Sequence, residues 1–542
     1  MKPFNHLQAI CQAMARPGFY PHPVETVQRI DTHISTVFLT GNWVYKLKKP
    51  VYLGFLDFRQ LSQRKHFCEQ EVVLNQRLSH DIYQGIVEIR ETDDGHFSLQ
   101  GSGRVVEYAV KMRQLPDAAG LKALLQEGAI DPKRMETLAH TMADFYKGGH
   151  RNSDIDYFGR PDIVSYNMEE NFRQLDPYVG SLLDQEKWEF LCQVSRTFLD
   201  HHRDVFERRV REGHIRDGHG DLRADHVYFH PGPQIIDCIE FNERFRYGDA
   251  AVDLAFLYMD LEHLGHPEWA RFFISAYAGA AQDPQLYTVI DFYAAYRAVV
   301  RLKVDAFRYP DAQPAAQETL KQDIDAYLQQ AYRYAIQFGR PTLWILCGLP
   351  ATGKSLVAEA LSDVLSIERF SSDRLRKAAG ISGNGRRTAF GQGAYRMEWR
   401  QKVYTQLLAH GHETLKAGHS VILDATFSRR KWRDEARRLA ADLDTNLIFA
   451  ETVCNEETMR SRLKNREGTS GLSDARLEHL PAMLENFEPL TETPTITHFQ
   501  VSSENPPEAM LLETLFRASE CKHRQVSRLL GAQGRLGNEK EG

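Results

Sequence analysis

The segment that decides the fold of the C-terminal half is Gly348-Leu349-Pro350-Ala351-Thr352-Gly353-Lys354-Ser355, which fits the pattern G-x-x-x-x-G-K-[ST]. It follows an apolar run, Thr342-Leu-Trp-Ile-Leu-Cys347, which predicts a buried strand, and it precedes a predicted helix. The glycines permit a tight loop with inward-facing N–H groups, and a helix N-terminus favours anions. The segment therefore predicts a phosphate-binding loop, in which Lys354 reaches the β- and γ-phosphates and the Ser355 hydroxyl ligates Mg²⁺.

The composition excludes several classes of protein. The chain has 542 residues, a formal net charge of −6, 42% hydrophobic residues and 26% charged residues, which gives no global attraction to nucleic acid or membrane. Seven scattered cysteines without a C-x-x-C pair argue against a disulfide framework or a zinc site. The N-terminal residues lack the apolar segment of a signal peptide, and no stretch of 18 uncharged apolar residues occurs. We expect a cytoplasmic protein without a membrane partner, and the sequence makes no prediction of oligomeric state.

Residues 1–310 are predicted to form one domain, with a small mixed lobe followed by a larger helical lobe. The small lobe begins near Val24 and ends near Leu115. Its predicted elements are a hairpin of residues 34–40 and 43–48, a helix over residues 64–78 and a strand over residues 105–112. Long amphipathic helices are predicted over residues 133–146 and 188–211.

A connector and a second domain are predicted after residue 310. Residues 311–340 are expected to form a helical connector. Strands alternate with helices in residues 341–520, and the predicted strands cover residues 342–347, 367–370, 420–423 and 446–452. This alternation predicts a parallel sheet with helices on both faces. Residues 521–542 are polar, and we expect them to form a flexible tail.

A second group of chemistry-bearing residues lies within the predicted helical lobe. His219-Gly-Asp221 is followed five residues later by His226, and the apolar run Ile235-Ile-Asp237 supplies another carboxylate. The spacing resembles the catalytic and metal-binding loops of the aminoglycoside phosphotransferase-like branch of the protein-kinase-like superfamily. This resemblance covers about residues 24–310 and implies a bilobal kinase-like fold that transfers the γ-phosphoryl of ATP to a hydroxyl.

The same resemblance implies roles for individual residues. Asp221 would accept or orient the proton of the acceptor hydroxyl, and Asp237 would hold Mg²⁺. Lys46 would contact the nucleotide phosphates and pair with Glu71. Lys48 and Glu69 are alternatives to these two, because a strand period of two places Lys46 and Lys48 on the same face.

One position departs from the family pattern. His226 stands where the branch has asparagine as a metal ligand, and imidazole suits Mg²⁺ less well than an amide oxygen does. An alternative is therefore that this domain binds ATP and regulates the second domain.

Two further aspartates match the family pattern. Asp249 and Asp253 follow at a spacing similar to that of the branch's structural aspartates, which brace the catalytic loop.

The second domain carries a further set of candidates. Asp373 and Arg376 follow the predicted strand over residues 367–370 as an Asp-x-x-Arg, which resembles P-loop kinases of the polynucleotide kinase and zeta-toxin type. The resemblance implies that Asp373 activates the acceptor hydroxyl and that Arg376 binds the anionic part of the substrate. Asp424 ends an apolar run and would help to hold Mg²⁺. Arg462 and Arg466 resemble the arginines of the lid that closes on the transferring phosphate.

The whole chain thus resembles bacterial proteins that join an aminoglycoside phosphotransferase-like domain to a P-loop kinase domain. The fold class implied is α/β and α+β multidomain, with ATP and Mg²⁺ as cofactors. A small-molecule acceptor is favoured. A nucleic-acid end kinase is the alternative, which the negative net charge and the absence of a recognised nucleic-acid module disfavour.

Overall fold

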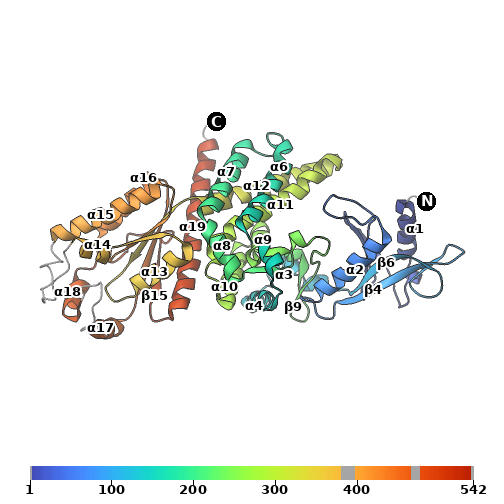
Figure 1. Ribbon diagram of the computed structural model, residues 1–542, viewed down its shortest axis with the longest axis horizontal. Coiled ribbons are helices and arrows are strands. Elements are labelled where there is room, and N and C mark those ends of the chain that lie inside the picture. Colours follow the sequence, from blue (N-terminus) through green and yellow to red (C-terminus); the bar gives the residue numbers. More distant parts are fainter. Residues whose placement is uncertain (1–2, 380–396, 466–475, 539–542) are drawn as a thin grey trace. The chain divides into compact units, whose positions relative to one another are not determined.

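The computed structural model describes residues 3–379, 397–465 and 476–538 (Figure 1). By backbone contacts, the chain divides into one unit of residues 1–164 with 207–281 and a second unit of residues 165–206 with 282–542. The expected boundaries near residues 310 and 341 differ from this division. The reason is that helix α11 (Leu286–Arg308) and the connector helix α12 (Pro314–Gly339) pack together in the second unit, along with α7 (Gln185–His201).

The small lobe of the first unit is a six-stranded antiparallel sheet with the order β1-β2-β3-β6-β4-β5. Its strands are β1 (Gln28–Asp31), β2 (Ser35–Leu39), β3 (Trp43–Lys48), β4 (Tyr83–Glu91), β5 (Phe97–Ser98) and β6 (Arg104–Arg113). Side chains alternate along β3, so that Tyr45 and Leu47 pack with α1 (Pro3–Met14), while Val44 packs with α2 (Leu61–Asn75). The lysines of β3 therefore face α2.

The second lobe of the first unit is mainly helical, as predicted. Its helices include α3 (Leu121–Gln126), α4 (Pro132–Gly148), α5 (Ser153–Tyr157), α9 (Ala250–His263) and α10 (Pro267–Ala281). Two short antiparallel pairs, β7 (Ile215–Asp217) with β10 (Tyr247–Asp249) and β8 (Val227–Phe229) with β9 (Pro233–Ile235), carry the loops that hold the predicted catalytic residues.

Helices α6 (Pro161–Leu175) and α8 (Arg203–Glu212) run across the division between the units. The single helix predicted over residues 188–211 is wrong in one respect, because it is interrupted between α7 and α8. His202 leaves the helical region at this point, with φ −111° and ψ 20°.

The second unit contains a parallel five-stranded sheet with the order β12-β13-β11-β14-β15. Its strands are β11 (Thr342–Cys347), β12 (Glu368–Ser371), β13 (Val421–Asp424), β14 (Asn446–Val453) and β15 (His498–Ser502). The predicted parallel sheet is confirmed. Strand β15 was not predicted.

Successive residues of β11 point to opposite sides of this sheet, so each face presents apolar side chains and is covered by helices. Leu343 and Ile345 pack with α15 (Met397–Lys416) and α16 (Arg430–Asp442). Trp344 packs on the other face with α13 (Lys354–Leu365) and α19 (Pro507–Asn538). Three further short helices are α14 (Ser372–Ala378), α17 (Glu456–Asn465) and α18 (Leu480–Glu485).

The flexible tail predicted for residues 521–542 is wrong for residues 521–538, which continue α19. Cys521 is buried in the cluster that packs on one face of the sheet, and Val526 further along the helix is buried as well. Residues 539–542 lie outside the described part of the chain. Within the described residues, no helix combines the length and the apolar character needed to cross a membrane.

Candidate active sites

The predicted phosphate-binding loop connects β11 to α13, and its two glycines have backbone conformations that other residues rarely adopt. Gly348 has φ +125°, and a Cβ there would lie 2.5 Å from the Thr452 carbonyl oxygen; Gly353 has φ +91°. The Lys354 ammonium donates to the Leu349 carbonyl oxygen at 2.7 Å and so lies over its own loop. The loop therefore has the shape and charge of an anion site at a helix N-terminus.

Oxygen atoms suited to a divalent cation lie beside this loop. Ser355 Oγ donates to Asp424 Oδ2 at 2.9 Å, and Asp424 is 3% exposed at the end of β13. Hydroxyl and carboxylate oxygens are ligands that Mg²⁺ prefers, so these two residues fit the metal that the sequence predicts. Arg369, which the sequence argument did not single out, lies 3.6 Å from the same carboxylate oxygen and donates to the Ser355 carbonyl at 3.2 Å.

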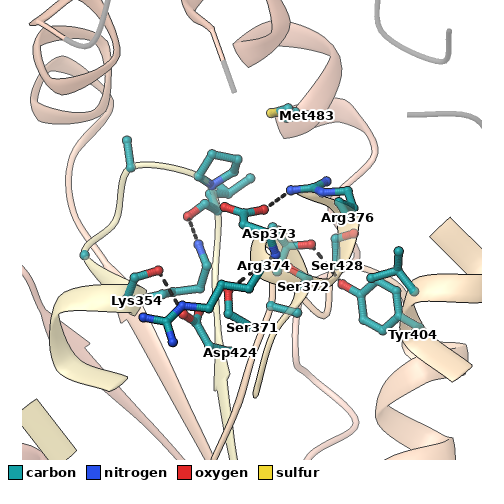
Figure 2. A pocket seen from close by; sticks show the side chains of 18 of the residues that line it. Lys354, Ser371, Ser372, Asp373, Arg374, Arg376, Tyr404, Asp424, Ser428 and Met483 are labelled. Atoms are coloured by element: carbon teal, nitrogen blue, oxygen red, sulfur yellow. Dashed lines mark hydrogen bonds and ion pairs between the residues drawn. The ribbon is translucent and has the colours of Figure 1, made fainter. Parts of the chain in front are cut away.

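These residues line a cavity of about 570 Å³ (Figure 2). The charged side chains that line it are mostly basic: Lys354, Arg369, Arg374, Arg376, Arg400 and Arg476, against Glu359, Asp373 and Asp424. The excess of positive charge suits a polyphosphate and an anionic second ligand in the same cavity.

Asp373 lines the same cavity as Lys354 and lies in the first turn of α14 (Figure 2). The Ser371 hydroxyl accepts from the Asp373 N–H at 3.3 Å and caps the helix. Arg376, one turn later, forms an ion pair with Asp373 itself. The predicted base and the predicted anion-binding arginine are thus adjacent, and the arginine is held by the carboxylate it follows.

Of the two predicted lid arginines, Arg462 is among the described residues and Arg466 is not. Arg462 Nη1 donates to the Ala351 carbonyl at 3.1 Å and to Ser503 Oγ at 2.7 Å, so Arg462 joins the phosphate-binding loop to the segment after β15. Its catalytic role stays a prediction. Arg466 lies outside the described residues.

In the first unit, Glu71 on α2 pairs with both lysines of β3. Lys46 Nζ lies 2.9 Å from Glu71 Oε1, and Lys48 Nζ donates to Glu71 Oε2 at 2.7 Å. Burial raises the pKa of Glu71, but the two ammonium groups outweigh burial and hold the pKa below its ordinary value. Glu69 is half exposed and lies 3.8 Å from Lys65, so it does not take part.

Two further carboxylates, one for each lysine, separate the roles of Lys46 and Lys48. Lys46 also forms an ion pair with Asp237, whereas Lys48 is fully buried and pairs with Glu240. Glu240 was not predicted, although it lies three residues after Asp237 in the sequence. The geometry favours Lys46 as the lysine that faces the predicted metal ligand.

Asp237 has unusual surroundings for a carboxylate. Its φ of +66° is rare for a residue other than glycine, and such strain is common at functional sites. Burial raises its pKa, but the Lys46 ammonium more than offsets burial, so the pKa of Asp237 is well below its usual range. Asp237 therefore stays ionised, as a metal ligand must be.

Of the two aspartates predicted to brace the loop, Asp253 does so. Asp253 Oδ2 accepts from the His219 N–H at 2.6 Å, and its Oδ1 accepts from the Gly220 N–H at 2.8 Å. Asp249 pairs with the buried Arg209 at 2.5 and 2.8 Å and caps α9.

The predicted catalytic residue Asp221 lies beside His226 and Arg223. Arg223 Nε donates to Asp221 Oδ1 at 2.9 Å, and His226 Nδ1 lies 2.8 Å from the Asp221 carbonyl oxygen. His226 Nε2 lies 3.6 Å from an Asp237 carboxylate oxygen. The structure therefore brings Asp221, His226 and Asp237 to one place, together with Lys46.

Comparison with known proteins assigns two separate stretches of the chain to two families. Residues 105–293 match the phosphotransferase enzyme family, and residues 343–490 match an AAA domain. Protein Rv2004c of Mycobacterium tuberculosis (strain ATCC 25618 / H37Rv) is 32% identical over 468 residues, which cover 85% of this chain and 91% of that protein. A gluconokinase of Gluconobacter oxydans (strain 621H) is 28% identical over 180 residues, which cover 32% of this chain and 90% of the gluconokinase.

Solved structures resemble the chain more distantly. The GDP complex of aminoglycoside 2'-phosphotransferase-IIIa is 16% identical, with a TM-score of 0.39, and the match covers 60% of this chain and 98% of that one.

Proposed function

Since the chain belongs to the same family as the mycobacterial relative and joins a phosphotransferase domain to a P-loop kinase domain, we propose that it transfers the γ-phosphoryl of ATP to a hydroxyl acceptor. In this proposal both domains use ATP with Mg²⁺. The observation that carries it is the arrangement of the P-loop cavity. Ser355 and Asp424 lie beside the phosphate-binding loop, and Asp373 lines the same cavity.

Each residue of that cavity has a role that its chemistry supports. Lys354 would bind the β- and γ-phosphates, and Ser355 with Asp424 would hold Mg²⁺, which neutralises charge on the phosphates. Asp373 would orient the acceptor hydroxyl and take its proton, because a hydroxyl is a poor nucleophile while it keeps that proton.

We further propose that the acceptor is a small molecule with an anionic group. Arg374 and Arg400 line the same cavity as Asp373, and Arg376 lies next to that carboxylate. Guanidinium groups bind carboxylates and phosphates in a planar, two-pronged manner. Similarity to a gluconokinase supports an acceptor with several hydroxyl groups.

For the first unit we propose a second ATP site, in which Lys46 binds the phosphates, Asp237 holds Mg²⁺ and Asp221 orients an acceptor hydroxyl. The support is the convergence of these side chains from β3, from the loop after β9 and from the loop before β8. A regulatory, non-catalytic role of this unit is the second candidate, which the histidine at position 226 favours.

The test is transfer of ³²P from γ-labelled ATP by the full chain to a panel of polyols, sugar acids, sugar phosphates and RNA oligonucleotides. We expect label in an anionic small molecule and its loss in Lys354→Ala. The variant Asp237→Asn reports on the first unit. If transfer by Asp237→Asn is unchanged for every acceptor, the first unit is regulatory. Labelling of RNA alone would contradict a small-molecule acceptor.

A further inference from the structure

The hydrogen bonds of His226 determine which of its nitrogens carries the proton. Nδ1 lies 2.8 Å from the Asp221 carbonyl oxygen, which only accepts, so Nδ1 must be the protonated nitrogen. Nε2 lies 3.2 Å from Arg223 Nη2, which only donates, so Nε2 accepts. The position that a metal would take at Nε2 is therefore already occupied by the guanidinium.

Arg223 is held in this position from more than one side. Its Nε donates to Asp221 Oδ1 at 2.9 Å, and its Nη1 lies 3.4 Å from a carboxylate oxygen of Asp225. The side chain is 16% exposed. An arginine stays charged at every physiological pH, so a fixed positive charge lies between the predicted base and the imidazole.

This arrangement does not fit the metal ligand that the family pattern implies at residue 226. A divalent cation at Nε2 would have to displace the guanidinium and would stand next to its positive charge. Asp237 is different, because one of its oxygens faces Lys46 while the other lies 3.6 Å from His226 Nε2. Its carboxylate remains suited to one divalent cation.

We propose that the first unit binds its nucleotide with a single divalent cation, held by Asp237, and that the Arg223 guanidinium occupies the place of a second cation beside Asp221. His226 is then a positioning residue: it accepts a hydrogen bond from Arg223 and anchors it to the Asp221 backbone. The guanidinium offers a fixed charge to the anionic phosphoryl group, as preorganised donors do in phosphoryl transfer. This inference rests on the proposed nucleotide site of the first unit.

The first experiment counts Mn²⁺ bound to the full chain by electron paramagnetic resonance, with a non-hydrolysable ATP analogue. The double variant Lys354→Ala with Asp424→Asn silences the second unit. Adding Asp237→Asn in that background gives the number of Mn²⁺ ions bound elsewhere on the chain, which is subtracted from the total. We expect one Mn²⁺ for the first unit. Arg223→Lys, which keeps the charge, is expected to retain one ion, whereas Arg223→Ala with His226→Asn is expected to bind two.

The second experiment starts from the chain in which Arg223 and His226 are both intact, and uses His226→Gln only to assign a signal. Pulsed resonance of the Mn²⁺ complex detects a directly bound ¹⁴N, and we expect no such signal. A nitrogen coupling that disappears in His226→Gln, or two ions with one nucleotide in the chain with Arg223 and His226 intact, would overturn this inference alone. Absence of both nucleotide and Mn²⁺ from the first unit would overturn it together with the proposed site.

Discussion

Asp373 and Asp424 line the same cavity, but their surroundings give them different expected effects when each is changed to asparagine. Asp424 is buried and accepts from the Ser355 hydroxyl, whereas Asp373 lies in the first turn of α14 and pairs with Arg376. Asp424→Asn removes a metal carboxylate and should raise the Mg²⁺ concentration needed for activity. Asp373→Asn should keep ATP affinity and lower turnover by about 10²–10⁴. Mg²⁺ titrations of the initial rate measure both effects.

The matched control for these two variants is Glu359→Gln. Glu359 lines the cavity as well, but its side chain is 67% exposed and lies 3.7 Å from Arg369. We expect turnover and Mg²⁺ requirement close to those of the unchanged chain. If Asp373→Asn transfers phosphate at the original rate, or if it alone raises the Mg²⁺ requirement, the role assigned to Asp373 is wrong.

His219 gives the first unit a predictable dependence of stability on pH. Burial lowers the pKa of this imidazole to about 4, and its ring accepts from the Asp221 N–H and donates to the Ile236 carbonyl. An unfolded chain binds this proton near pH 6.5, so the unfolded state holds more protons between pH 6.5 and 4 and stability falls as pH falls. The loss is about 2 kcal/mol between pH 7.5 and 5.

Urea unfolding at pH 7.5 and 5 checks this for His219→Gln, which keeps a donor for the Ile236 carbonyl. The free-energy difference between the unchanged chain and the variant should shift by about 2 kcal/mol between the two pH values, in favour of the variant at pH 5. His96→Gln is the control, because His96 is exposed on the same unit. Its replacement should change the free energy of unfolding by less than about 0.5 kcal/mol. If the free energies of unfolding of the unchanged chain and of His219→Gln differed by the same amount at both pH values, the lowered pKa of His219 would be refuted.

At the scale of elements, the sequence predicted those whose faces have a clear apolar pattern. β11 is apolar after Thr342 and buried on both faces, and its predicted bounds are those of the structure. β15 escaped prediction because it is an edge strand with one buried residue, Val501, and its His498 and Gln500 pair with Glu451 instead of filling a core. An edge strand of this kind lacks the apolar run that marks a central one.

The candidate sites show a similar limit. The motifs identified Asp237 and both lysines of β3, but period two left Lys46 and Lys48 equivalent. The distinction comes from Asp237 and Glu240, which lie about 190 residues away in the sequence and reach β3 only through the fold. Long-range pairing of this kind has no local signal.

Helix α19 yields a stability prediction, since its second half was expected to be a tail. Val526 is fully buried, and Val526→Ala removes two methyl groups from a packed site. The free energy of unfolding should fall by about 2 kcal/mol, from lost burial and the cavity left behind. Arg528→Ala, two residues further on an exposed position, should change it by less than about 0.5 kcal/mol. Urea unfolding measures both, and equal effects would mean that this half of α19 does not pack.

At the scale of the whole molecule, each unit has its own candidate phosphate lysine and its own candidate metal carboxylate: Lys46 with Asp237, and Lys354 with Asp424. Calorimetry of the full chain with a non-hydrolysable ATP analogue and Mg²⁺ should therefore give a stoichiometry near two. Lys354→Ala should remove one site and leave the affinity of the other unchanged.

Lys46→Met is the complementary change, and the structure explains why the fold should tolerate it. Glu71 is fully buried, and an unpaired buried carboxylate would be strongly destabilising. Lys48 still donates to Glu71 at 2.7 Å when Lys46 is gone, so the charge keeps a partner. Thermal unfolding close to that of the unchanged chain checks this, and calorimetry should then show one remaining site, which Lys354→Ala abolishes in the double variant. A stoichiometry of one in the unchanged chain, or loss of both sites through either single change, would contradict two independent nucleotide sites.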